Sequence, residues 1–193
     1  MQIHKRNDSG IWVICALAEE FDYPDANIAY TGMGKVNGAI TAQHIITAER
    51  PRLIIQLGAA GSRAFDYGQI VSVNQFVQRD MNTTEFLSPK YVVPGTDDAQ
   101  ILEYGLRDEK YPAAICGSGD TFVRTIETDI WNIVDMEVFG IAYAARAAGI
   151  PMKCYKFISD GKSENTSDKE FLDVLNEARA ALNKLYEEIV NES

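Results

Sequence analysis

One stretch decides the fold class of this chain: NIAYTGMGKVNGAITAQHIITAERPRLIIQLGAAG, residues 27–61. Its parts, in order, are an apolar segment (27–30), a glycine-containing turn (31–34), a helix-forming segment (35–50) that Pro51 ends, the apolar segment LIIQL (53–57) and a second glycine-containing turn (58–61). Short apolar segments rich in β-branched residues are typical of buried strands. The order strand, turn, helix, strand is that of a parallel α/β sheet.

The same alternation extends outward in both directions. Further strands are predicted for the apolar runs 11–17, 69–77, 113–116 and 153–159. Apolar residues spaced by three and four predict a helix over about 135–148, which Gly149 and Pro151 end. Ser167 and Glu170 predict a capping box for a long C-terminal helix. Its apolar stripe is formed by Phe171, Leu175, Ala178, Leu182, Leu185 and Ile189.

Length and charge limit the class of protein. The 193 residues, 46% of them apolar, suffice for one compact domain with its own core, so a single domain over 1–193 is expected. The net charge of −10 argues against a surface that neutralises nucleic-acid phosphates or anionic lipids. The polar N-terminal segment MQIHKRNDSG lacks the apolar centre of a secretory signal, and no stretch is apolar enough for a membrane span. We therefore expect a cytoplasmic protein without nucleic-acid or membrane partners.

The common metal and cofactor patterns are missing. The three cysteines lie far apart in apolar runs, which predicts buried thiols, and the two histidines share no ligand spacing. Gly32 and Gly34 precede a helix, but Asn37 stands where a dinucleotide-binding GxGxxG pattern needs its third glycine. GxSxG and Walker patterns are absent as well. We expect no metal and no cofactor.

Polar residues and glycines gather just after the predicted strands, at 18–20, 58–61, 117–120 and 159–161. In α/β sheets, ligands bind at the loops that follow the carboxyl ends of the strands. Each segment taken singly also has a structural explanation, because a glycine lets a strand meet a helix and an acid can cap one. With the other patterns excluded, carboxylate chemistry remains.

Five collinear segments resemble the nucleoside phosphorylase and nucleosidase superfamily, in particular the methylthioadenosine/adenosylhomocysteine nucleosidases. They are CALAEEF (15–21), TGMGKVNGA (31–39), QLGAAGS (56–62), GSGDTFV (117–123), and IVDME (133–137) followed by KCYKFISDG (153–161). The likeness covers about residues 11–190. With the order of elements it implies a single-domain, three-layer α/β/α fold around a central mixed, mainly parallel sheet. The implied activity is hydrolysis of the N-glycosidic bond of a purine nucleoside.

The resemblance places the catalytic carboxylates on Glu20, Glu137 and Asp160. Glu20, the second acid of a pair with Glu19, would be the base that activates water. Glu137 would accept hydrogen bonds from the ribose hydroxyls, and Asp160 would protonate purine N7, which favours adenine as the base. Glycosidic cleavage builds positive charge on the sugar and negative charge on the base, so three separate acidic groups suit this chemistry.

Six further residues would bind the nucleoside under the same resemblance. Met136 would pack under the ribose, Phe122 would stack on the base, and the backbone of Val123 would contact the purine edge. The remaining lining residues would be Ser159, Gly58 and Ala59. Without the resemblance, a core phenylalanine would be the preferred explanation of Phe122, and an acid stabilised in a first helical turn that of Glu137.

The sequence leaves three points open: whether water or phosphate is the nucleophile, which group the nucleoside carries at its 5′ position, and whether the chain has a subunit partner. Related phosphorylases hold phosphate with an arginine and a serine where this chain has Gln56 and Ala59, which favours water, but nearby Arg63 and Arg79 keep a purine nucleoside phosphorylase as an alternative. The segments 78–81 and 86–95 give a shortened and altered version of the family's loop over the 5′ substituent, in a pocket that a neighbouring subunit completes in the family. The resemblance thus implies a homodimer. A non-catalytic nucleoside-binding protein on the same fold is a further alternative.

Overall fold

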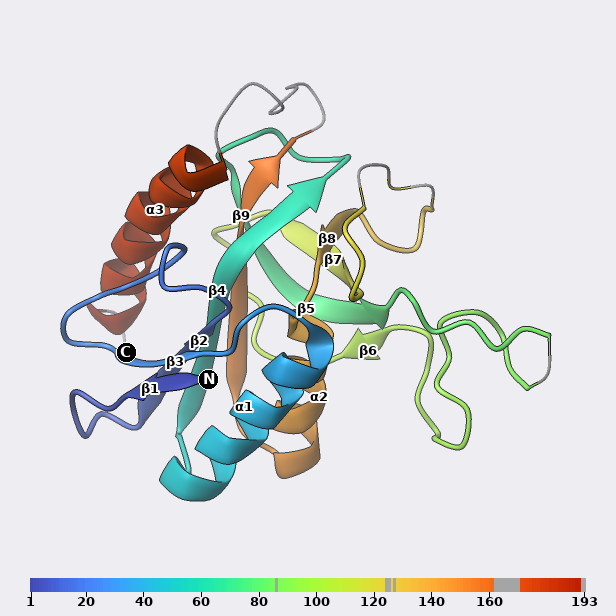
Figure 1. The fold of residues 1–193 in the computed structure, drawn as a ribbon, viewed down its shortest axis with the longest axis horizontal. Coiled ribbons are helices and arrows are strands. Elements are labelled where there is room, and N and C mark those ends of the chain that lie inside the picture. Colours follow the sequence, from blue (N-terminus) through green and yellow to red (C-terminus); the bar gives the residue numbers. More distant parts are fainter. Residues whose placement is uncertain (86, 124–125, 127, 162–170, 192–193) are drawn as a thin grey trace.

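The computed structural model describes residues 1–85, 87–123, 126, 128–161 and 171–191. In this part of the chain the helices are α1 (Lys35–Glu49), α2 (Val138–Ala148) and α3 (Phe171–Asn191). The strands are β1 (Gln2–His4), β2 (Ile11–Cys15), β3 (Asn27–Tyr30), β4 (Leu53–Ser62), β5 (Ile70–Gln78), β6 (Leu102–Glu103), β7 (Ala113–Ser118), β8 (Ile133–Asp135) and β9 (Met152–Asp160). Together they form the predicted mixed α/β fold with a central sheet (Figure 1).

The strands form one sheet that partly closes on itself. β9 pairs in parallel with β4 and antiparallel with β5, β7 pairs in parallel with β5 and β8, and β8 returns antiparallel to β4. β4, β9, β5, β7 and β8 therefore form a closed ring of paired strands, and β2, β3 and β1 extend the sheet beyond β4. Because β2, β4 and β9 run parallel, the ends of β2 and β9 point toward the same edge of the sheet.

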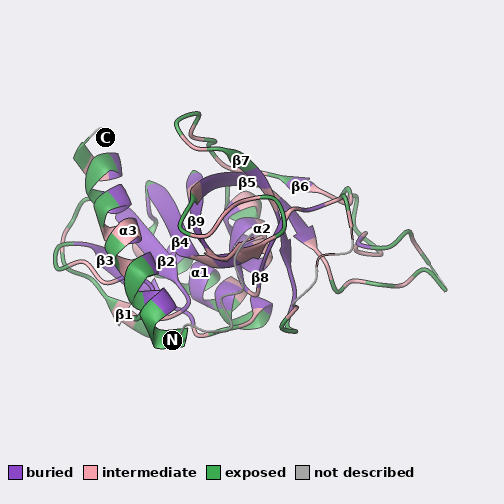
Figure 2. Cartoon of the chain, turned by 90° about the horizontal axis from the view of Figure 1, so that it is seen from above, coloured by how far each residue is buried: buried purple, intermediate pink, exposed green. Residues whose placement is uncertain are grey.

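Helices cover both faces of the sheet (Figure 1). On one face, α1 and α2 share a core with β4 that contains Ile46, Ile141 and Ile54. On the other face, α3 shares a core that contains Leu182 and Ile55. Ile54 and Ile55 are consecutive in β4, so the alternation of side chains along a strand supplies one residue to each core. Figure 2 shows that α3 is buried toward the sheet and exposed on its outer side.

α1 and α2 approach each other closely at two glycines. A Cβ on Gly140 would overlap the carbonyl oxygen of Lys35, and one on Gly38 would lie 3.0 Å from the carbonyl oxygen of Glu137. Because glycine has no side chain, the first turns of the two helices can pack in direct backbone contact at these positions. Each helix ends in the left-handed conformation, at Arg50 for α1 and at Gly149 for α2, in front of the prolines that the sequence analysis used as stops.

Two predicted boundaries and one predicted core residue are wrong. Residues 58–61, predicted as a turn, continue β4 because they pair with β9. Residues 133–135, of which the last was predicted to open a helix, form strand β8 between β4 and β7, and α2 begins only at Val138. Phe171 is 66% exposed, so it does not belong to the buried stripe of α3, whereas the other five predicted members do. The predicted capping residues Ser167 and Glu170 lie outside the described residues.

The segment between β5 and β6, residues 79–101, extends away from the body of the fold (Figure 1). Tyr91 anchors it through an edge-on ring contact with Trp131, and Asp98 accepts a hydrogen bond from Arg146 of α2. The three cysteines are free and buried, as predicted. No described helix is long and apolar enough to cross a membrane, and the described residues hold no group of His, Cys, Asp or Glu side chains arranged for a metal ion.

Candidate functional site

The predicted site residues come from segments that meet at one edge of the sheet. Glu20 follows β2 and contacts Ala59 of β4. Asp160 ends β9 in register with Gly61 of the same strand β4. Glu137 lies between β8 and α2. Glu20 and Asp160 therefore both adjoin β4, and Glu137 follows β8, which also pairs with β4.

Glu20 is buried and held by three donors. Its Oε1 accepts a hydrogen bond from the Ala59 N–H at 3.0 Å. Its Oε2 accepts from the Leu17 N–H at 3.1 Å and from the Cys15 thiol at 3.4 Å. The neighbouring Glu19 is exposed. Of the two adjacent acids, Glu20 is therefore the one whose carboxylate reaches β4.

Glu137 turns away from its own helix. It stands at the N-cap of α2 without a side-chain capping bond, and its Oε1 accepts a hydrogen bond from the Gly34 N–H at 2.9 Å. Burial raises the pKa of Glu137 to about 7, the neighbouring charges of Asp135 and Glu20 act in the same direction, and Lys156 opposes them. A carboxylate stabilised by its own helix is thus the wrong explanation for Glu137, because its bond goes to the start of α1.

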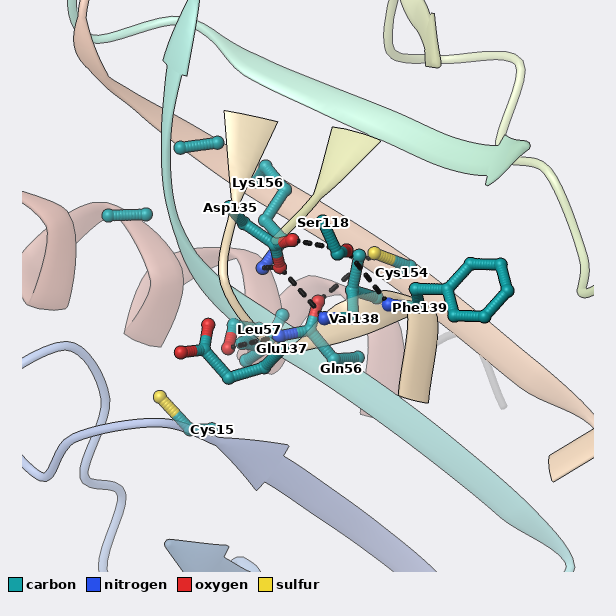
Figure 3. Close-up of polar contacts among 12 residues, drawn as sticks. Cys15, Gln56, Leu57, Ser118, Asp135, Glu137, Val138, Phe139, Cys154 and Lys156 are labelled. Carbon is teal, nitrogen blue, oxygen red and sulfur yellow. Dashed lines mark hydrogen bonds and ion pairs between the residues drawn. The ribbon is translucent and has the colours of Figure 1, made fainter. Parts of the chain in front are cut away.

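Lys156 and Asp135 form a buried ion pair close enough to Glu137 to affect its pKa. The Lys156 ammonium lies 2.8 Å from Asp135 Oδ2, and both side chains are 1% exposed (Figure 3). Asp135 Oδ1 accepts from the Ser118 hydroxyl at 2.5 Å, and Oδ2 accepts from the Val138 N–H at 3.0 Å. Burial alone disfavours the charge on Lys156, but the carboxylate of Asp135 outweighs it and raises the pKa of the lysine. Both groups are therefore charged, and Asp135 caps α2.

Polar groups converge on the space above Gly58. A Cβ built there would lie 3.3 Å from Lys156 Nζ, 3.4 Å from Gln56 Nε2 and 3.6 Å from Glu20 Oε1. Any side chain at Gly58 would fill the point where an ammonium, an amide and a carboxylate meet. We call Glu20, Asp135, Glu137 and Lys156 the carboxylate–lysine cluster. A cation beside three acids can position a polar molecule and a proton acceptor together.

The loop 119–123 follows β7 and is far more exposed. Phe122 is 77% exposed, so the structural explanation of a core phenylalanine is wrong. Asp120 is bound to the start of α1, because its Oδ1 accepts a hydrogen bond from the Lys35 N–H at 2.8 Å. Phe122 and Val123 therefore lie on a loop that is tied to the helix beside Glu137.

The remaining predicted residues lie at intermediate depth. Asp160 and Ser159 are partly buried at the end of β9, and the Ser159 hydroxyl donates to the Ala60 carbonyl at 3.3 Å. Met136 is also partly buried, directly before Glu137. Ala59 has its N–H directed at Glu20. Of these residues, Ala59 contacts the carboxylate–lysine cluster directly, and the others lie at the end of β9 and between β8 and α2.

The two arginines that kept a phosphate site as an alternative are bound elsewhere. Arg63 lies 2.7 Å from the exposed Asp129. Arg79 donates to the Gly119 carbonyl at 2.9 Å and to Thr121. Lys156, the cation of the cluster, is paired with Asp135. Each of these three cations is therefore already bound to a carboxylate or to a loop oxygen.

A mixed sheet with helices on both faces defines the chain as an α/β protein, and its buried acids gather where strands end. Residues 23–191 match the family model of the Phosphorylase superfamily, and the chain belongs to this family. Glu20 lies just before the matched range, so its assignment depends on geometry and on the sequence segment 15–21.

Among individual proteins, the chain is similar to 5′-methylthioadenosine/S-adenosylhomocysteine nucleosidases. It is 28% identical to that of Anoxybacillus flavithermus over 166 residues, which cover 74% of this chain and 71% of the relative. It is 26% identical to that of Staphylococcus haemolyticus over 183 residues, which cover 84% and 80%.

Solved structures show the same fold. The futalosine hydrolase of Helicobacter pylori superposes with a TM-score of 0.80 at 21% identity, covering 95% of this chain and 97% of that one. The 5′-methylthioadenosine/S-adenosylhomocysteine nucleosidase of the same organism, with butyl-thio-DADMe-Immucillin-A, also has a TM-score of 0.80, at 20% identity and with coverage of 95% and 98%.

Sequence reasoning missed the cationic part of the site. Lys156 was considered only as part of a strand, and Asp135 only as part of a helix opening. One signal in the sequence could have indicated the pair. Lys156 and Asp135 each lie in an otherwise apolar segment, and because a buried charge is rarely unpaired, each predicts an oppositely charged partner. Lys35 and Asp80, which contact Asp120, carry no such signal because neither lies inside a predicted apolar strand.

Proposed function

We propose that the chain is a nucleosidase that hydrolyses the N-glycosidic bond of an adenine nucleoside, such as methylthioadenosine or adenosylhomocysteine, and releases the free base. The observation that carries this proposal is the carboxylate–lysine cluster at the strand ends of a Phosphorylase superfamily member. The names of the similar curated proteins support the substrate class.

In the proposed reaction, the bond between C1′ and the base nitrogen breaks while a water oxygen bonds to C1′. Glu20 takes a proton from that water. Glu137 accepts hydrogen bonds from the ribose hydroxyls and stabilises the positive charge that develops on the sugar. Asp160 donates a proton to purine N7, so the base leaves neutral.

The other predicted residues would form the binding surface for base and sugar. Phe122 would stack on the purine and the Val123 backbone would contact its edge, which suits the exposed position of this loop. Met136 would pack under the ribose. Ser159, Gly58 and Ala59 would line the floor between the two. A loop that is exposed without ligand can adjust to the base when it binds.

Water is favoured over phosphate as the nucleophile. A phosphate dianion needs cations and hydroxyls that are not already neutralised. Here Lys156 is paired with Asp135, Arg63 with Asp129, and Ala59 offers no hydroxyl. A phosphorylase is the alternative that phosphate dependence would reveal.

The test is base release by the purified full chain from methylthioadenosine, adenosylhomocysteine, adenosine and inosine, with and without phosphate, followed by chromatography. We expect adenine from at least one adenine nucleoside without phosphate. Strict phosphate dependence would make the protein a phosphorylase, and binding without release would make it a nucleoside-binding protein. Asp160→Asn should abolish adenine release, whereas Asp129→Asn, an exposed control, should not.

We further propose a cytoplasmic homodimer in which each chain, 1–193, is one three-layer α/β/α domain. The support for a dimer is an open apolar groove of about 750 Å³ between α1 and α2, bordered by Val36, Ile40, Phe139, Tyr143 and Val93. Val36 and Ile40 are 65% and 60% exposed. Light scattering after gel filtration should give twice the chain mass, and Ile40→Glu should give the single-chain mass. Buried free thiols suit a reducing compartment.

A further inference from the structure

Three charged side chains connect the loop 119–123 to the start of α1. Lys35 Nζ lies 2.5 Å from Asp80 Oδ2 and 3.0 Å from Asp120 Oδ2. The Asp120 N–H also donates to Asp80 Oδ2 at 3.1 Å. The lysine side chain is only 11% exposed. The side chains of Asp80 and Asp120 are 32% and 48% exposed. An isolated exposed ion pair contributes little, but here one ammonium contacts two carboxylates and Asp80 also accepts the Asp120 N–H, so three contacts hold the geometry.

The adjacent residue contacts the opposite half of the site. Gly34 donates its N–H to Glu137 Oε1 at 2.9 Å, while the Lys35 N–H donates to Asp120 Oδ1 at 2.8 Å. Gly34 has a φ of 106°, a conformation that favours glycine. Two consecutive residues therefore set the distance between Glu137 and the loop.

Charged contacts, rather than core packing, also hold the far side of the loop. The Arg79 guanidinium donates to the Gly119 carbonyl at 2.9 Å and to the Thr121 hydroxyl at 3.2 Å. Phe122, in the same loop, is 77% exposed and contributes little to a core. Arg79 and Asp80, which directly follow β5, therefore bind the loop, and Lys35 of α1 binds it as well.

We propose that Lys35 is a positioning residue whose ammonium, held between Asp80 and Asp120, fixes the loop 119–123 at the distance from Glu137 that a purine nucleoside requires. This inference rests on the proposed function, in which the loop binds the base and Glu137 binds the ribose. An intact nucleoside must occupy both halves in register. Free adenine needs the loop and Asp160 but makes no contact with Glu137.

The test compares Lys35→Met with the wild type. We expect KM for methylthioadenosine to rise about tenfold or more with a smaller change in kcat, because a misplacement of about 1 Å is costly in an oriented site. The Kd of free adenine, measured by calorimetry, should change less than about threefold. Lys35→Arg, which keeps the cation, should recover most of the loss. Lys5→Met is the matched control, since it breaks the Lys5–Glu49 pair of 2.9 Å at the other end of α1.

The outcomes separate the two proposals. Absence of base release by the wild type would remove the proposed function. An active wild type with an unchanged KM in folded Lys35→Met, or an equal loss of nucleoside and adenine binding, would overturn the positioning role. If Lys35→Met does not fold, Asp80→Asn keeps the Lys35–Asp120 contact and should still raise KM; an unchanged KM in that variant would also overturn the proposal.

Discussion

The carboxylate–lysine cluster and the loop 119–123 border the same site but are built in opposite ways. In the cluster, Glu20, Asp135 and Glu137 are each 7% exposed and Lys156 is 1% exposed. Their contacts come from strand backbone, helix starts and one another. The loop holds Phe122 at 77% exposure and is attached by ion pairs to Lys35 and by hydrogen bonds from Arg79.

This difference in burial suits two different tasks, stabilisation of charge by the cluster and binding of the base by the loop. Groups that must face developing charge work best when they are held in place before the substrate arrives, which burial and saturated hydrogen bonds achieve. A surface that receives a flat base has to admit it and release it, which favours an exposed loop with few buried contacts. The cluster should therefore respond to mutation in rate and stability, and the loop mainly in binding.

The largest expected effect is that of Glu20→Gln. Removal of a general base at a fixed position should lower kcat by about 10³-fold without unfolding the protein. Glu19→Gln is the matched control, since Glu19 is exposed, and it should stay within about twofold of wild type. Steady-state rates of base release measure both variants. Equal activity of Glu20→Gln and Glu19→Gln would contradict the assignment.

Lys156→Met should destabilise the fold by about 3–5 kcal/mol, because it leaves the Asp135 carboxylate buried and unpaired. Lys153→Met on the same strand, where the lysine is only partly buried, should cost less than about 1 kcal/mol. Urea denaturation gives both values. The double variant Lys156→Met/Asp135→Asn should regain part of the loss; a loss equal to the sum of both single effects would speak against a pair.

Glu137 should make stability depend on pH. Its pKa in the folded chain is about 7 and its ordinary value is 4.5, so between these values the folded state binds more protons than the unfolded state. Its contribution is therefore fully present below about pH 4.5 and is lost as the pH rises through 7, by about 3 kcal/mol.

The measurement is the difference in free energy of unfolding between wild type and Glu137→Gln, from urea titrations at several values across that pH range. The difference should shrink as the pH rises, because glutamine does not titrate. A constant difference would show that the pKa of Glu137 is not raised in the fold.

Phe122→Ala should have the smallest effect on the fold. Because the ring is exposed, stability should change by less than about 0.5 kcal/mol, while loss of stacking on the base should lower kcat/KM about tenfold. Phe76→Ala, at a fully buried phenylalanine, should instead destabilise by about 3–5 kcal/mol. Thermal unfolding and base-release assays distinguish the two. A large loss of stability in Phe122→Ala would contradict the comparison of cluster and loop.

Much of the fold was predictable because it depends on local patterns. The strands at 11–15 and 27–30 and the helix α1 follow from apolar runs, glycine turns and Pro51, and the structure confirms them. The errors fall where long-range pairing overrides local signals. The local sequence of residues 58–61 predicts a turn, but these residues continue β4 because they pair with β9. Strand β8 likewise forms through its pairing with β4 on one side and β7 on the other.

The site divides in the same way. Motifs predict Glu20, Glu137 and Asp160 as site residues, and the structure shows the first two as buried acids that contact β4 and the start of α1. No pattern indicated that Glu137 would bind Gly34 or that Lys156 would pair with Asp135. These contacts join segments 103 and 21 residues apart.

By itself, the sequence predicted six of the nine described strands, the three described helices, the α/β class, the family and the residue types available for acid chemistry, because these depend on composition and short-range spacing. Only the tertiary structure decided which acid of the Glu19–Glu20 pair is buried, that Glu137 has a raised pKa, and that Phe122 lies outside the core. The physical reason is that burial, pairing and electrostatic coupling arise between segments remote in the chain, where close packing brings charges into a shared low-dielectric space.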